Sequence, residues 1–140
     1  MGWESPVDPS GRPATPLPGR PTIVQTRGMT LESYELVMLR RPPHATQYDE
    51  ETLERIQAEH MAFHAARRAE GTVVTNGPVV GQPDPSLRGF TFYRVGSVER
   101  AREIAEQDPS VLAGRLVVDV MEWLCPADTM ILPGRPVEPT

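Results

Sequence analysis

Lysine is absent from this chain of 140 residues, in which all 14 basic residues are arginine. A chain without lysine cannot form a Schiff base with a substrate, attach pyridoxal phosphate or place a P-loop lysine on a nucleotide. The single cysteine, Cys125, likewise excludes an internal disulfide and a thiolate metal cluster. One unpaired cysteine favours a reducing compartment, and we therefore expect a cytoplasmic protein.

Long apolar runs and an excess of positive charge are also missing. No stretch approaches the roughly 18 apolar residues of a membrane span, and the N-terminus lacks the basic start and apolar segment of a signal peptide. The 14 basic residues are outnumbered by 19 acidic ones, for a net charge of -5. That balance opposes binding to nucleic acid or to an anionic membrane, so we expect neither as a partner.

Proline is abundant, and most of it lies at the two ends of the chain. Of 16 prolines, six fall in residues 1–28 and four in residues 126–140. Such composition is typical of extended or polyproline-like chain. We predict a flexible N-terminal tail over residues 1–30, a folded domain over 31–125 and a second proline-rich tail over 126–140. Trp3, Ile23 and Val24 leave room for the first tail to dock on a neighbour.

Between the tails, the residue pattern predicts four strands and two helices. The strands are expected where β-branched and aromatic residues concentrate, at residues 34–41, 72–80, 90–95 and 116–124. The helices are expected at residues 49–70, which lack glycine and proline, and at residues 97–107, which end before Asp108-Pro109. The order βαββαβ predicts an α+β, ferredoxin-like fold with an antiparallel sheet and both helices on one face.

Each predicted helix places one chemically useful side chain toward the sheet. At 100° per residue, His60 lies about 20° from Leu53 on the inner face of the first helix. In the second helix, Asp108 follows Ala101 and Ala105 at the end of the apolar face. Because both helices cover the same sheet face, His60 and Asp108 can meet over it. A carboxylate beside an imidazole fixes its tautomer and gives a base that works near neutral pH.

Two other interpretations of these residues compete with acid–base chemistry. His60 and His64 form an HxxxH pair on one helical turn, but the metalloprotease version of that motif has glutamate where this chain has Met61. His44 could add a third ligand but is expected in an exposed loop, so we predict no metal. In the other interpretation, His60 and Asp108 satisfy each other inside a non-catalytic binding or scaffold subunit.

Several short motifs in the middle of the chain occur together in one known family. A histidine, His60, stands 11 residues before Gly71, and the chain then shows Gly77-Pro78, Arg88-Gly89, Asp108-Pro109, Ala113-Gly114 and a closing Trp123. In this combination the chain resembles the YciI-like (YCII-related) family over about residues 34–124. It departs from many members in Gln57, where they have arginine, in the extra His64 and in its proline-rich tails.

The resemblance implies a homodimer in which two ferredoxin-like sheets pack into an α+β barrel, and an active site containing His60 and Asp108. The family includes a dehydrochlorinase of a chlorinated hydroxyquinol, and the fold is related to that of muconolactone isomerase. We therefore expect a lyase or isomerase that needs no cofactor and acts by elimination, isomerisation or cyclisation on a phenolic, quinone-like or other activated cyclic substrate. Candidate substrate-binding residues are Arg88, Gly77, Pro78, His64 and Arg115.

Overall fold

The computed structural model describes residues 22–130 as five strands and three helices. In chain order the elements are β1 (Thr22–Thr26), β2 (Met29–Arg40), α1 (Glu50–Glu70), β3 (Val73–Pro78), β4 (Leu87–Tyr93), α2 (Val98–Ala105), α3 (Pro109–Leu112) and β5 (Val117–Pro126). None of the helices in this range has the length and apolar character needed to cross a membrane.

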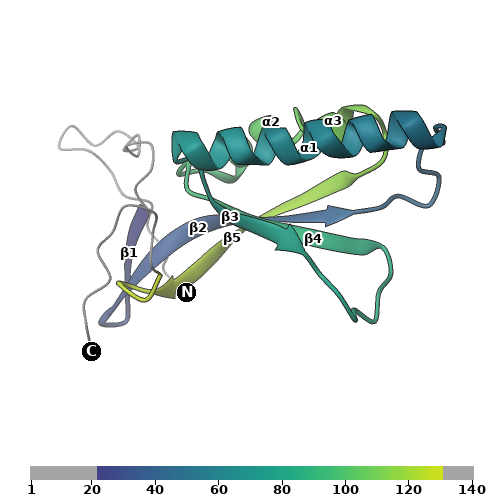
Figure 1. The fold of residues 1–140 in the computed structure, drawn as a ribbon. Coiled ribbons are helices and arrows are strands. Elements are labelled where there is room, and N and C mark those ends of the chain that lie inside the picture. Colours follow the sequence, from purple (N-terminus) through teal and green to yellow (C-terminus); the bar gives the residue numbers. More distant parts are fainter. Residues whose placement is uncertain (1–21, 131–140) are drawn as a thin grey trace.

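The sheet is antiparallel throughout, and β2 is its central strand. β5 pairs with one edge of β2, β4 pairs with the other, and β3 lies beyond β4. Without β1, the strand order β5-β2-β4-β3 is that of the split βαβ arrangement, which confirms the predicted ferredoxin-like fold. All three helices lie on the same face of this sheet (Figure 1).

The predicted tail of residues 1–30 needs a correction, because residues 22–30 form β1, a turn and the start of β2. β1 pairs with β2 through a two-residue turn, Arg27-Gly28, in which both residues have positive φ angles of 46° and 76°. Two positive φ angles match the twist of a tight hairpin. β5 ends at Pro126, one residue inside the predicted C-terminal tail. Residues 1–21 and 131–140 of the two tails lie outside the described residues.

The local sequence explains where α1 begins and ends. The side chain of Asp49 accepts a hydrogen bond from the backbone N–H of Thr52, which caps the first turn. Gly71 ends the helix in the left-handed conformation, with φ of 85°. Its backbone N–H donates hydrogen bonds to the carbonyl oxygens of Arg67 and Arg68. These two caps set the first and last turns of α1.

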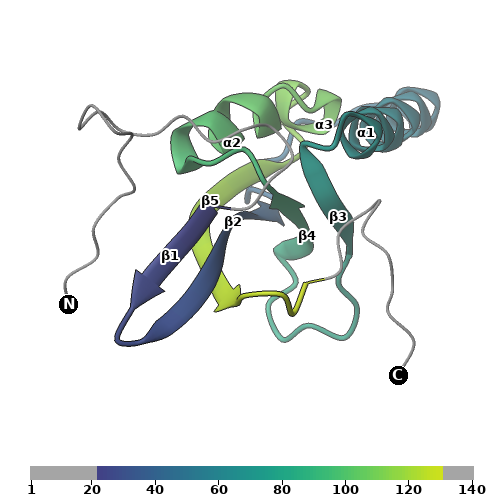
Figure 2. The ribbon, with the colours of Figure 1, turned by 90° about the vertical axis from the view of Figure 1, so that its left-hand side faces the viewer.

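Most of the hydrophobic core lies between the sheet and the helices. Its buried members come from β2, β3, β4, α2 and the residue before β5: Val37, Leu39, Val73, Tyr93, Ala101, Ala105 and Leu116. The opposite face has a smaller cluster of Tyr34, Val74 and Cys125. No helix among the described residues covers that opposite face (Figure 2), and the side chains of Met121 and Trp123 are exposed there.

Candidate active site

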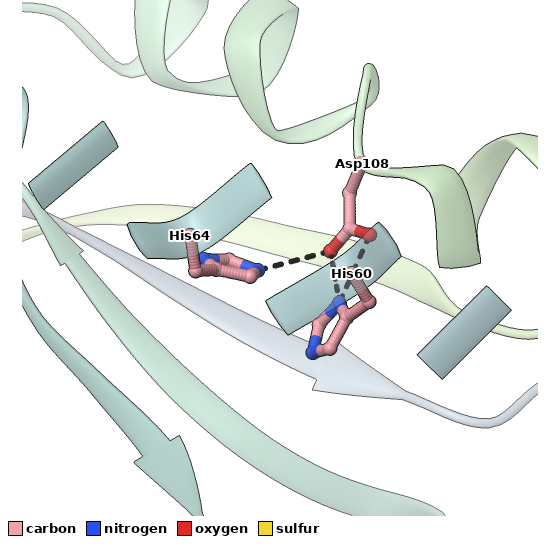
Figure 3. Close-up of side chains that lie close together, drawn as sticks. All are labelled: His60, His64 and Asp108. Carbon is pink, nitrogen blue, oxygen red and sulfur yellow. Dashed lines mark hydrogen bonds and ion pairs between the residues drawn. The ribbon is translucent and has the colours of Figure 1, made fainter. Parts of the chain in front are cut away.

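His60 and Asp108 meet between α1 and the turn that joins α2 to α3. His60 Nδ1 lies 2.7 Å from Oδ2 and 2.9 Å from Oδ1 of Asp108. The structure therefore brings together the two residues that the helix geometry placed on one side of the sheet. An ionised carboxylate only accepts hydrogen bonds, so the proton of a neutral His60 ring is on Nδ1. The other ring nitrogen, Nε2, points away from Asp108 (Figure 3) and is the basic nitrogen.

His64 is the second imidazole held by the same carboxylate. It follows His60 by one turn of α1, and its Nε2 lies 3.0 Å from Oδ2 of Asp108. The two rings stand edge to face, with centroids 4.6 Å apart. His64 is only 2 % exposed and is not among the residues that line the pocket described below. Its predicted contact with a substrate is thus replaced by a contact with Asp108.

Asp108 is buried and still strongly acidic. Burial alone would raise the pKa of this carboxyl, but hydrogen bonds from His60 and His64 and from the backbone N–H of Ser110 lower it to about 2. The Ser110 bond, 2.9 Å long, is also the N-terminal cap of α3, in which Pro109 is the first residue. Asp108 therefore stays negatively charged at neutral pH and holds both histidines in place.

Tyr93 of β4 lies behind this cluster in the core. Its side chain is fully buried, and burial together with the negative charge of Asp108 raises the pKa of its hydroxyl above the ordinary value. Neither the Tyr93 hydroxyl nor Nδ1 of His64 has a hydrogen-bond partner among the described residues. The inner side of the cluster therefore holds two buried polar atoms without a described partner, whereas His60 is the histidine that lines the pocket described next.

A pocket of about 880 Å³ opens beside His60. Its volume lies within the range of small-molecule sites. Four of the predicted substrate-binding residues line it together with His60: Gly77, Pro78, Arg88 and Arg115. Gln57, at the position where many family members have arginine, also lines it. The pocket thus gathers residues from α1, β3, β4 and the segment before β5.

One wall of the pocket depends on a close approach of β3 and β4. A Cβ added to Gly89 would lie 2.7 Å from the carbonyl oxygen of Gly77, which no real side chain tolerates. The Arg-Gly motif is thus needed for packing as well as for placing Arg88. This explains why a glycine occurs at a strand position that otherwise favours larger residues.

Sequence reasoning missed one arginine of this pocket. Arg41 directly follows β2 and lines the same cavity as Arg88 and Arg115. The available signal was the strand itself, since Arg41 continues the alternation of Val37 and Leu39 on the helix-covered face. The Pro42-Pro43 pair that follows Arg41 indicates only where the strand ends.

The described residues contain one group with the donor atoms for a metal ion, namely His60, His64 and Asp108, whose polar atoms lie within 4.8 Å of one another. The two imidazole nitrogens of this group already contact Asp108, so a cation would have to replace both hydrogen bonds. Metal-bound histidines usually donate their second nitrogen to a partner, and Nδ1 of His64 has none among the described residues. The donors fit a hydrogen-bonded triad better than a metal centre.

Comparisons with known proteins give a structural neighbour and a family. A solved structure of 5-chloro-2-hydroxyhydroquinone dehydrochlorinase from Burkholderia phenoliruptrix AC1100, in complex with 2,5-dihydroxybenzoquinone, is 20 % identical. It superimposes with a TM-score of 0.46 over 64 % of this chain and 92 % of its own. No protein of curated function matches. The family model of the YCII-related domain matches residues 35–124, and the chain therefore belongs to the YCII-related family.

Proposed function

We propose that the chain is a cofactor-independent acid–base enzyme that acts on a small activated ring compound in the cytoplasm. The observation that carries the proposal is the bond from Nδ1 of His60 to the buried carboxylate of Asp108. That bond leaves Nε2 as the proton acceptor on a residue that lines the pocket. A scaffold pair would need no such cavity beside it.

The chemistry follows from these two residues. Nε2 of His60 takes a proton from a ring carbon or hydroxyl, and the released electron pair forms a double bond as the leaving group departs. In an isomerisation, the same nitrogen returns the proton at another carbon. Asp108 stabilises the imidazolium formed in between. General base catalysis supplies about 10² to 10⁴ in rate, so the substrate must already be activated, as phenols and quinone-like rings are.

The test is a comparison of two histidine variants. Phenolic, quinone and lactone compounds are first screened for binding to the wild type, and bound compounds are then assayed for turnover. We expect His60→Ala to lower kcat at least about 100-fold, whereas the control His44→Ala, in an exposed loop outside the pocket, keeps wild-type activity. Turnover in His60→Ala within a few fold of wild type would contradict the proposal and favour a non-catalytic binding subunit.

We also propose that the protein is a homodimer that pairs the sheet faces without helices. On β5, the side chains of Val117, Met121 and Trp123 are exposed by 45 %, 38 % and 37 %, and a domain of this size gains stability by sharing a core. Sedimentation of the wild type should show twice the monomer mass, and Met121→Asp should shift it to a monomer. A wild type that stays monomeric at micromolar concentration would refute the dimer.

A further inference from the structure

Three arginines from separate segments of the chain line the pocket. Arg41 follows β2, Arg88 lies at the start of β4, and Arg115 precedes β5. Arg68 of α1 also lines the pocket, but its guanidinium is engaged with the side-chain oxygen of Asn76. The group formed by Arg41, Arg88 and Arg115, called the arginine triad below, brings positive charge into one cavity of a chain with a net charge of -5.

The arginine triad has no acidic partner among the residues that the structure describes. Among the ion pairs of the described residues, none involves Arg41, Arg88 or Arg115. The adjacent Arg40 shows the contrast, since it contacts both Asp84, at 3.1 Å, and Asp119, at 2.8 Å. Two glutamates, Glu50 and Glu54, line the pocket from α1 and form no ion pair with the triad. The chain thus neutralises one of two consecutive arginines and leaves the other facing the pocket.

The guanidinium group of Arg41 lies close enough to Arg88 and Arg115 for their positive charges to act on it. The pKa of Arg41 is lowered, first by partial burial and then by the positive charges of Arg115 and Arg88. Of the three, Arg115 has one described side-chain hydrogen bond, from Nη1 to the carbonyl oxygen of Thr46 at 3.1 Å. Like charges gathered without a counter-charge are unfavourable, and an anion placed among them removes that cost.

We propose that the arginine triad is an oxyanion subsite, so that the substrate is a small ring compound carrying a carboxylate or a phosphate besides the group that His60 deprotonates. The inference rests on the proposed function, because it takes the pocket beside His60 as the substrate pocket. Guanidinium groups present paired donors that match carboxylate and phosphate oxygens. The subsite would orient the ring and select substrates by charge.

The test measures binding without turnover, by isothermal titration with three ligands that share one ring. The ligands are hydroquinone, which has no anionic group, 2,5-dihydroxybenzoate and 4-hydroxyphenyl phosphate. We expect the wild type to bind at least one of the two anions about tenfold more tightly than hydroquinone, since charge-assisted hydrogen bonds are stronger than neutral ones. The tighter anion identifies which oxyanion the subsite prefers. Its advantage should shrink as salt is raised.

Arginine variants locate the effect. Arg41→Met and Arg88→Met should each lose most of the anion advantage, and Arg41→Lys should keep part of it because charge remains without the paired donors. The control Arg102→Met removes an exposed arginine of α2 outside the pocket and should bind like the wild type. Circular dichroism and thermal unfolding check that each variant is folded. Neither Arg41 nor Arg88 belongs to the buried core, so both substitutions should be tolerated.

Two results would overturn the inference: equal affinity of the wild type for hydroquinone and both anions, or anion binding that is unchanged in Arg41→Met and Arg88→Met. Either result would leave the acid–base proposal standing, because His60→Ala is judged on turnover alone. In the opposite case, anion binding that depends on the triad together with an active His60→Ala variant would retain the subsite and reject the proposed function.

Discussion

Asp108 and Glu35 are buried carboxyl groups on the same, helix-covered side of the sheet, and their acidities differ widely. Asp108 is 1 % exposed and has a pKa of about 2, whereas Glu35 is 2 % exposed and has a pKa of about 7. Burial raises the pKa of both groups. Their surroundings therefore decide the difference.

The partners of the two carboxyl groups explain the contrast. Asp108 accepts hydrogen bonds from two imidazoles and one backbone N–H. Glu35 accepts from the backbone N–H groups of Val95, at 2.7 Å, and Gly96, at 3.0 Å. It also lies opposite Glu122 of β5, whose negative charge raises its pKa further. A buried acid thus needs donors and no acidic neighbour to remain ionised.

The largest expected effect is the loss of Asp108. Asp108→Ala should lower the free energy of unfolding at pH 7 by about 3 kcal/mol, because it leaves two imidazoles without their acceptor and removes the cap of α3. Urea unfolding gives the value. The control Asp119→Ala removes an exposed carboxylate that contacts Arg40 and should cost less than about 1 kcal/mol. Equal losses in both variants would show that burial of the carboxylate does not matter.

Glu35→Gln should have the next largest effect and the opposite sign. The raised pKa of Glu35 means that the folded state holds this proton more tightly than the unfolded state. Its contribution to stability is therefore present below about pH 4.5 and is lost as pH rises toward 7. Glu35→Gln should raise the free energy of unfolding at pH 8 by about 2 kcal/mol. It should also make the free energy of unfolding depend less on pH.

The measurement for Glu35 is a series of urea unfolding curves between pH 4.5 and pH 8. The control Glu99→Gln changes an exposed glutamate at the start of α2. Its free energy of unfolding should depend on pH as that of the wild type does. A Glu35→Gln variant that is less stable than the wild type at pH 8 would contradict this prediction. It would mean that the ionised carboxylate of Glu35 stabilises the folded state, as that of Asp108 does.

The smallest expected effect is that of replacing His64, one of the two histidines that contact Asp108. His64→Leu removes one donor to the carboxylate and should raise the pKa of Asp108 above about 2, whereas His64→Gln keeps a donor and should raise it less. Carbon-detected NMR titration of the Asp108 carboxyl measures both shifts. The lowered pKa of Asp108 stabilises the folded state above about pH 4, and this stability is lost as pH falls toward 2. In His64→Leu, the free energy of unfolding should therefore fall less between pH 4 and pH 2 than in the wild type. Identical titrations in all three proteins would show that His64 is only a neighbour.

Much of this arrangement could be predicted from the sequence, because it depends on local periodicity. The period of α1 and the Asp108-Pro109 stop placed His60 and Asp108 on one side of the sheet, and the structure brings them together. β1 could not be found in the same way, because five residues among prolines give no sustained pattern. Its one local signal was Arg27-Gly28, a pair suited to a tight hairpin.

The remaining features depend on contacts between distant segments. Glu35 accepts hydrogen bonds from the loop before α2, about 60 residues further along the chain, and nothing around Glu35 in sequence indicates that loop. The position of Arg41 in the pocket likewise requires knowledge of how β2, β4 and the segment before β5 align. The helix period places His64 on the inner face of α1. Its contact with Asp108 depends on where the turn between α2 and α3 lies relative to α1, and that position is not encoded in the local sequence.

The cap that Asp108 provides to α3 has a consequence for how this family can vary. One oxygen of the carboxylate accepts from Ser110 while the other accepts from His64, and both lie within reach of Nδ1 of His60. A mutation of Asp108 that removes its contact with His60 therefore also removes the cap of α3 and weakens the local turn. Because the aspartate caps α3 whether or not His60 acts on a substrate, its presence in another member of the family is not by itself a sign of activity.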